Sequence, residues 1–123
     1  MSNDFLTPLS VRLLPEGGDP RWQLIEPLVY SSAILGTVTV PAGFITDFVS
    51  FAPLKNVGHR AAVVHDYLYS CGDVERETAD LVLKEALELT VSDEALIENM
   101  FVAVRLFGGG HKENIYQFYK EVP

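Results

Sequence analysis

Residues 58–73 read GHRAAVVHDYLYSCGD, and this stretch predicts the architecture of the second half of the chain. Over residues 58–69, apolar side chains recur at intervals of three and four, which is the spacing of one face of an α-helix. The run SCGD at 70–73 then ends the helix, and Asp73 is a suitable N-cap for a second helix. Because the turn is short, we expect these two helices to lie antiparallel and in contact.

The rest of the chain completes an α+β pattern around these two helices. Apolar periodicity predicts that the second helix runs over about 74–90 and that a third follows over about 93–107. Residues 8–50 instead combine short alternating stretches with dense turn clusters, so we expect a small antiparallel β-sheet there. Its expected strands are 9–13, 22–26 and 30–40. The sequence therefore predicts a single α+β domain over residues 1–123, with the sheet packed against the three helices.

The composition narrows the classes of partner. The hydrophobic fraction is 48% and the aromatic fraction 11%, which indicates a folded globular protein. Seventeen acidic residues against nine basic ones give a formal charge of −8, so the chain lacks the Lys and Arg surface that binding nucleic acid requires. No apolar run is as long as a membrane span, and the first residues, MSND, lack the basic start of a signal peptide. We therefore expect no nucleic-acid partner, no integral membrane segment and no signal peptide.

One group of residues on the first two helices has the composition of a hydrolytic site. His65 and Tyr69 are four residues apart and share one face of the first helix, whereas Asp66 is turned about 100° away. Asp80 follows the turn at roughly the separation by which His65 precedes it, so we expect its carboxylate to reach the His65 ring. His65 is then the candidate general base, oriented by Asp80, with Tyr69 beside it. The alternative is a buried polar network in which these groups only satisfy one another.

Two further aspartates are candidate metal ligands. Asp66 faces away from Tyr69, toward an apolar loop expected at 41–53, in which Asp47 is the one acidic residue. Carboxylate and carbonyl oxygens are hard ligands, which suit Ca²⁺ or Mg²⁺ better than zinc. We therefore expect Asp66 and Asp47 to hold Ca²⁺ or Mg²⁺. The alternative for Asp47 is that it accepts hydrogen bonds from backbone N–H groups and so fixes the loop, as in an Asx turn.

Five short segments together carry a first resemblance. In chain order they are PL (8–9), VPAGFITDF (40–48), AVVHDYLY (62–69), AD (79–80) and AVRLFG (103–108). In this combination the chain resembles a family of short phage and prophage proteins of unknown function. The resemblance implies a bacteriophage or prophage origin. With a single cysteine and no signal peptide, it also implies a location in the host bacterial cytoplasm or incorporation into the virion.

A second, shorter resemblance concerns the candidate site. The pattern His65-Asp66-x-x-Tyr69 followed by Asp80 is similar to the core signature of the secreted phospholipases A2. That resemblance implies that His65 activates water, Asp66 binds calcium, and Tyr69 and Asp80 hold the histidine. The sequence thus predicts a metal-assisted hydrolase acting on an ester. Two other roles remain open: a non-catalytic virion or tail-associated component, in which His65 and Asp80 merely fasten two helices, and a small protein that binds a host protein.

Overall fold

The computed structural model describes residues 3–15, 21–46, 58–71 and 73–107. Its elements are, in chain order, β1 (Asp4–Phe5), β2 (Val11–Leu13), β3 (Trp22–Leu24), β4 (Leu28–Ser32), β5 (Gly36–Val40), β6 (Ile45–Thr46), α1 (His59–Cys71), α2 (Arg76–Thr90) and α3 (Glu94–Phe107). Strands precede helices, so the expected α+β class is confirmed. The helix bounds differ from the expected ones by at most two residues, and α2 and α3 end where we expected.

The strands form two small antiparallel sheets and not the single sheet that we expected. Their orders are β1-β4-β5 and β2-β3-β6. The division follows from the residues after β5. Pro41 has no N–H group with which to extend the ladder, and Gly43 turns the chain at a φ of 91°. Ile45 therefore pairs with Gln23 of β3 in the second sheet, inside a segment for which we expected a loop.

The expected strand at 30–40 is also wrong, because the chain reverses in the middle of it. β4 and β5 form an antiparallel hairpin in which Ser32 faces Gly36. The Ser32 hydroxyl oxygen accepts the backbone N–H groups of Ile34 and Leu35 at 3.0 and 3.1 Å, which fixes the turn. Gly36 completes the reversal at a φ of 81°, in the left-handed region that favours glycine.

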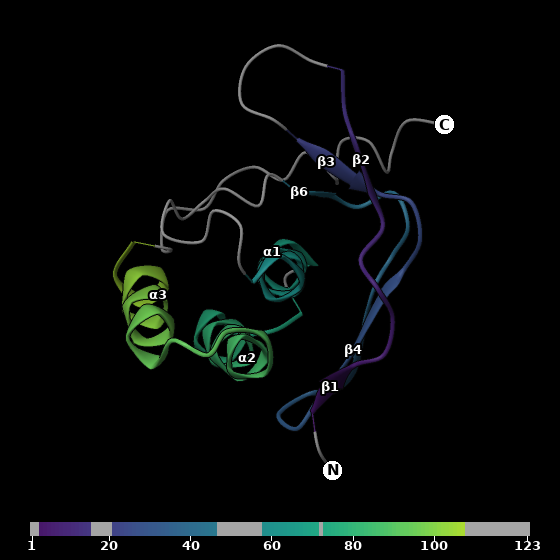
Figure 1. Cartoon of the computed structure of the whole chain (residues 1–123). Coiled ribbons are helices and arrows are strands. Elements are labelled where there is room, and N and C mark those ends of the chain that lie inside the picture. The colour runs from purple at the N-terminus through teal and green to yellow at the C-terminus, as the bar shows by residue number, and fades with distance from the viewer. Residues whose placement is uncertain (1–2, 16–20, 47–57, 72, 108–123) are drawn as a thin grey trace.

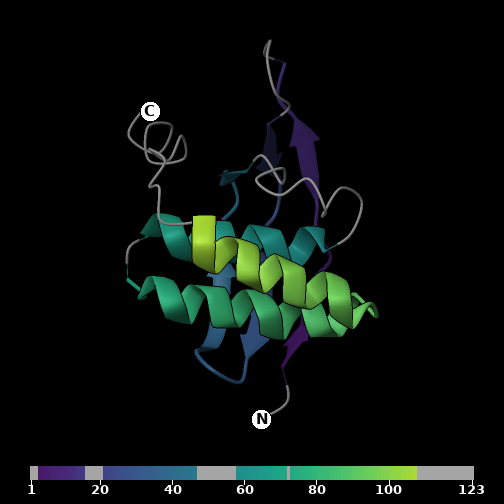
Figure 2. The same ribbon diagram turned by 90° about the vertical axis from the view of Figure 1, so that its left-hand side faces the viewer.

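α1 and α2 cover one face of the first sheet as a second layer (Figure 1). α1 packs against β4 and β5, and α2 packs against α1 and β4. α3 packs against α2, on the side away from the strands, and Figure 2 shows α3 nearest the viewer, with the other helices and then the strands behind it. The last helix therefore touches the strands little and is held mainly by α2.

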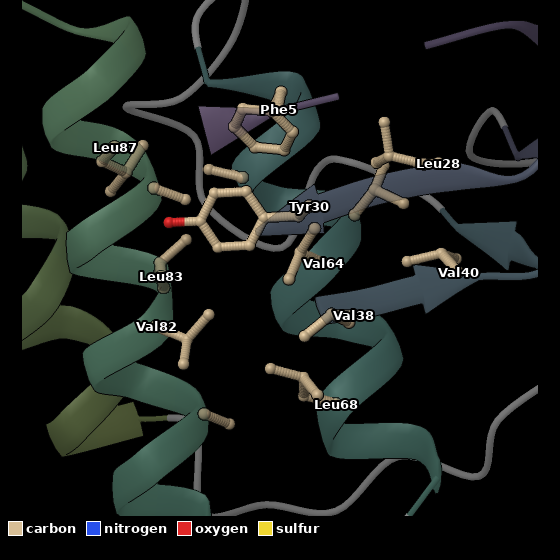
Figure 3. Close-up of a cluster of buried hydrophobic side chains, with 14 of the residues drawn as sticks. Phe5, Leu28, Tyr30, Val38, Val40, Val64, Leu68, Val82, Leu83 and Leu87 are labelled. Atoms are coloured by element: carbon tan, nitrogen blue, oxygen red, sulfur yellow. The ribbon is translucent and has the colours of Figure 1, made fainter. Parts of the chain in front are cut away.

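The core lies between these two layers (Figure 3). Alternate residues of β4 and β5 point toward the helices, as the period of two in a strand requires. They meet one stripe from each of the first two helices, and the residues drawn and labelled are Phe5, Leu28, Tyr30, Val38, Val40, Val64, Leu68, Val82, Leu83 and Leu87. Each large apolar side chain buried in this way contributes about 1.5–3 kcal/mol. This packing fixes α1 and α2 relative to each other.

The ends of the later helices differ in how they are capped. The expected N-cap at Asp73 is wrong, because α2 begins at Arg76 and the N-cap position is held by Glu75, whose side chain makes no capping hydrogen bond. Asp93 does cap α3, since its Oδ1 accepts the N–H of Leu96 at 3.1 Å. Among the described residues, no helix is long and apolar enough to cross a membrane.

Candidate functional site

The antiparallel packing of α1 and α2 places His65 and Asp80 in direct contact. Nε2 of His65 lies 2.7 Å from Oδ1 of Asp80, although the two residues are fifteen positions apart in the chain. Both side chains belong to the buried faces of their helices: His65 is 7% exposed and Asp80 is 0% exposed. The contact that helix spacing and the short turn predict is therefore present, at the level of the core and not on the surface.

Tyr69 joins this pair from the next turn of α1. Its hydroxyl donates to Oδ1 of Asp80 at 3.0 Å, so His65 and Tyr69 share one acceptor oxygen. Their rings also touch, with centroids 4.5 Å apart and planes inclined at 43°. The four-residue spacing on α1 thus brings the three candidate catalytic residues together around one carboxylate.

Two arginines that we did not predict from the sequence complete the cluster. Nη1 of Arg105, on the last turn of α3, donates to Oδ2 of Asp80 at 2.9 Å. Nε of Arg76, on the first turn of α2, donates to the Tyr69 hydroxyl at 3.1 Å. A fully buried carboxylate needs a charged partner, and Arg105 is the only basic residue in the sequence of α3. The sequence alone does not show that this arginine meets Asp80, because the contact depends on how α3 crosses α2.

These contacts determine where the protons reside. Burial raises the pKa of Asp80, but the hydrogen bonds and charges from its three partners, His65 foremost, outweigh burial and hold this pKa below its ordinary value. Burial likewise raises the pKa of Tyr69, which remains a hydrogen-bond donor. Because an ionised carboxylate only accepts hydrogen bonds, Nε2 of His65 carries the hydrogen and Nδ1 carries the lone pair of the neutral ring. Within the described part of the chain, no residue forms a hydrogen bond with Nδ1.

The expected metal ligands are not brought together in the same way. Asp66 is half-buried on α1, next to His65 but turned away from its face. Asp47, the second expected ligand, lies outside the described residues. Among residues 3–15, 21–46, 58–71 and 73–107, no group of three His, Cys, Asp or Glu side chains is arranged to hold a metal ion. The described residues therefore provide too few donors to define a cation site, and Asp66 stays a predicted ligand.

Comparison with known proteins places the chain in a family. No curated protein and no solved structure matches it. Residues 22–104, more than half of the chain, match the family described as a protein of unknown function (DUF1353). The matched segment runs from β3 almost to the end of α3 and contains His65, Tyr69 and Asp80. The expectation of a family without an assigned activity is confirmed: the chain belongs to the DUF1353 family.

Proposed function

We propose that this protein is a hydrolase in which His65 is the general base and Asp80 orients and stabilises its ring. The observation that supports the proposal is the 2.7 Å hydrogen bond between His65 Nε2 and Asp80 Oδ1, inside a cluster that keeps Asp80 ionised. This is the arrangement in which a carboxylate fixes one histidine tautomer and leaves the other ring nitrogen to take up a proton.

The proposed reaction is ester hydrolysis in two proton transfers. Nδ1 of His65 removes a proton from a water molecule as the water oxygen attacks the carbonyl carbon of the ester. Asp80 stabilises the resulting imidazolium through Nε2–H, and Tyr69 keeps the carboxylate oriented. When the bond to the alkoxide breaks, the proton passes from Nδ1 to the leaving oxygen, which regenerates the neutral ring. Each step uses only side chains that the structure describes.

The proposed substrate class and the proposed cation rest on a resemblance in the sequence. The resemblance to the secreted phospholipases A2 makes a phospholipid ester the most concrete substrate, and it gives Asp66 the role of a calcium ligand. The resemblance to short phage and prophage proteins adds the proposal of a bacteriophage or prophage origin. A divalent cation held by Asp66 would polarise the ester carbonyl, but no proton transfer above depends on it.

The test is a hydrolysis assay on purified protein. Chromogenic esters of short and long acyl chains and phospholipid vesicles are offered with and without millimolar calcium, and acid release is followed in a pH-stat. We expect the wild type to hydrolyse at least one of them and His65→Gln to lose about 10²–10⁴-fold in rate. His59→Gln is the matched control, because His59 is an exposed histidine on the same helix. Hydrolysis of no substrate, or equal rates in the wild type and His65→Gln, overturns the proposal.

A second candidate is a non-catalytic component of a phage particle. One observation favours it: the partners of Asp80 come from α1 and α3, so this carboxylate also fastens three helices together. If the role is structural, the wild type has no hydrolytic activity and co-sediments with phage particles. His65→Gln then either unfolds the protein or leaves it stable, with no activity to lose. A folded His65→Gln variant that has lost a measurable wild-type activity contradicts the structural role.

A further inference from the structure

Both oxygens of the Asp80 carboxylate are held by donors from other parts of the chain. Oδ1 accepts from His65 and Tyr69 on α1, and Oδ2 accepts from Arg105 at 2.9 Å. Of the described residues bonded to Asp80, Arg105 alone carries a permanent charge. With Oδ2 bound to a guanidinium, the carboxylate cannot rotate away from His65 without breaking a charge-assisted hydrogen bond in the protein interior.

Arg76 connects this contact to the end of α3. Its Nη2 donates to the backbone carbonyl of Val104, at 2.9 Å, and to that of Arg105. α3 ends at Phe107, so these carbonyls belong to its last turn, where a helix leaves acceptors without partners of its own. The Nε of Arg76 meanwhile binds Tyr69. The result is a closed ring of contacts through Asp80, Tyr69, Arg76 and Arg105.

The strands add no charge to this ring. β4 and β5, which pack against α1, contain no Asp, Glu, Lys, Arg or His, and their one titratable residue, Tyr30, is bonded to Glu85 elsewhere on α2. On α1 itself Asp66 is the nearest other charge, turned to a different side of the helix. Within the described residues, Arg105 on α3 is therefore the one permanently charged side chain that is bonded to Asp80.

The geometry points to Arg105 as a positioning residue of the site: it fixes the Asp80 carboxylate and thereby holds His65 in the tautomer that carries its hydrogen on Nε2. Arg76 sets the place of Arg105 by binding the carbonyl end of α3. The effect of Arg105 on catalysis rests on the proposed function, but its effect on the His65 tautomer does not. The hydrogen bond that one ring nitrogen donates determines which tautomer a histidine adopts. If the acceptor, here the Asp80 carboxylate, moves away, the ring populates both tautomers.

A salt bridge nearby supplies a matched control. Lys84 of α2 and Glu98 of α3 lie 3.1 Å apart, with 34% and 58% of their side chains exposed. This pair joins the same two helices as Asp80 and Arg105, yet it does not contact Asp80. Lys84→Met therefore removes an α2–α3 bridge and one positive charge without touching the ring of contacts. If Arg105 acted only by fastening α3, the two substitutions would have the same effect on His65.

The test is the tautomer of His65 measured by NMR. Protein labelled with ¹⁵N-histidine contains three imidazoles, and the His65→Gln variant identifies the signals of His65. Spectra are recorded at a pH high enough that the ring nitrogens report neutral imidazole. We expect nearly all of His65 to be in the Nε2–H form in the wild type and in Lys84→Met, a mixture of both forms in Arg105→Met, and recovery of most of the Nε2–H form in Arg105→Lys. A wild-type tautomer in a folded Arg105→Met variant overturns the inference.

Two further measurements keep the inference testable in every case. If Arg105→Met does not fold, Arg76→Gln is decisive, because it leaves all donors of Asp80 in place while it frees the end of α3 and removes the hydrogen bond from Arg76 to the Tyr69 hydroxyl. An unchanged tautomer in Arg76→Gln then overturns the inference. Where a substrate has been found, Arg105→Met should lower kcat roughly 10-fold at an unchanged KM. Absence of hydrolysis in the wild type defeats the proposed function alone, since the tautomer still decides the role of Arg105.

Discussion

Glu85 and Tyr30 join the helical layer to the first sheet through a hydrogen bond of 2.6 Å, from the Tyr30 hydroxyl to Oε1 of the carboxylate. Oε2 of Glu85 also accepts the backbone N–H of Ala33 at 3.0 Å, in the turn between β4 and β5. The Tyr30 side chain is fully buried, and burial together with this hydrogen bond raises its pKa, so the hydroxyl stays a donor. One carboxylate thus ties α2 to both a strand and a turn.

Removing this carboxylate should destabilise the protein. Glu85→Ala leaves the buried hydroxyl of Tyr30 without its acceptor, and we expect a loss of about 1–3 kcal/mol in the free energy of unfolding, measured with urea. Glu88→Ala is the control, because Glu88 is exposed on the same helix and its removal should cost no more than about 0.5 kcal/mol. Equal losses in the two variants would show that the contact contributes nothing.

Protonation of Asp80 at low pH should lower the free energy of unfolding. The folded-state pKa of Asp80 lies below its ordinary value of 3.8, because its hydrogen bonds outweigh burial. A lowered pKa stabilises the folded state fully above the unfolded value, and that stabilisation is lost as the pH falls through the folded value. Asp80→Asn should therefore be less stable than the wild type at neutral pH, by roughly 3–5 kcal/mol. The difference should shrink below pH 3.8 in urea titrations at a series of pH values; a constant difference contradicts this.

Tyr69→Phe should separate the contribution of the Tyr69 hydroxyl from that of the Tyr69 ring. The ring contact with His65 is kept, but Asp80 loses one donor and Arg76 loses one acceptor. We expect a loss of about 1–2 kcal/mol in stability and, in a hydrolysis assay, a kcat roughly 10-fold lower. Tyr67→Phe serves for comparison, since the Tyr67 ring packs on Phe44 and not on Asp80. A kcat that falls equally in both variants argues against a role for the hydroxyl.

Gly36→Ala should test the turn between β4 and β5. No atom lies within 4 Å of an added Cβ, so the cost is one of backbone conformation alone, at a φ of 81°. We expect a loss of about 1–2 kcal/mol in the free energy of unfolding. Gly36→Asn should lose less, because asparagine tolerates the left-handed region better than alanine does. Alanine and asparagine variants of equal stability would contradict the conformational explanation.

Calcium or magnesium should stabilise the wild type if Asp66 is a metal ligand. An ion that binds only the folded state increases the free energy of unfolding by mass action, by about 2.7 kcal/mol at a hundredfold excess over its Kd, and so raises the melting temperature. We therefore expect millimolar Ca²⁺ or Mg²⁺ to raise the Tm of the wild type and to leave that of Asp66→Asn unchanged. Thermal melts with and without each ion measure this. An equal shift in both proteins, or none in either, removes the predicted metal site.

The helical half of the protein was predictable because its information is local. A four-residue spacing puts His65 and Tyr69 on one face, and a short turn brings Asp80 back to them, whatever the rest of the chain does. Arg105 is different: it lies twenty-five positions from Asp80, and its contact depends on how α3 crosses α2. Apolar periodicity tells which face of α3 is buried but not which residue of α2 it meets.

The strands were less predictable because an alternating run does not reveal where it folds back. Residues 30–40 alternate on both sides of the turn, and only the Ser32 hydroxyl and Gly36 distinguish a hairpin from a single strand. The separation into two sheets depends on Pro41 and Gly43, two residues that also suit an ordinary strand end. The roles of His65, Tyr69 and Asp80 in catalysis stay predictions.

The position of Arg105 on the last turn of α3 also has a consequence for synthesis. The chain emerges from the ribosome N-terminus first, so the strands, α1 and α2 leave the ribosome before α3 does. At that stage the carboxylate of Asp80 has only His65 and Tyr69 as partners, and Arg76 has no helix end to bind. A nascent or truncated chain that stops before Arg105 therefore holds every candidate catalytic side chain without the contact that we propose to fix them, and the cluster is complete only when α3 has packed against α2.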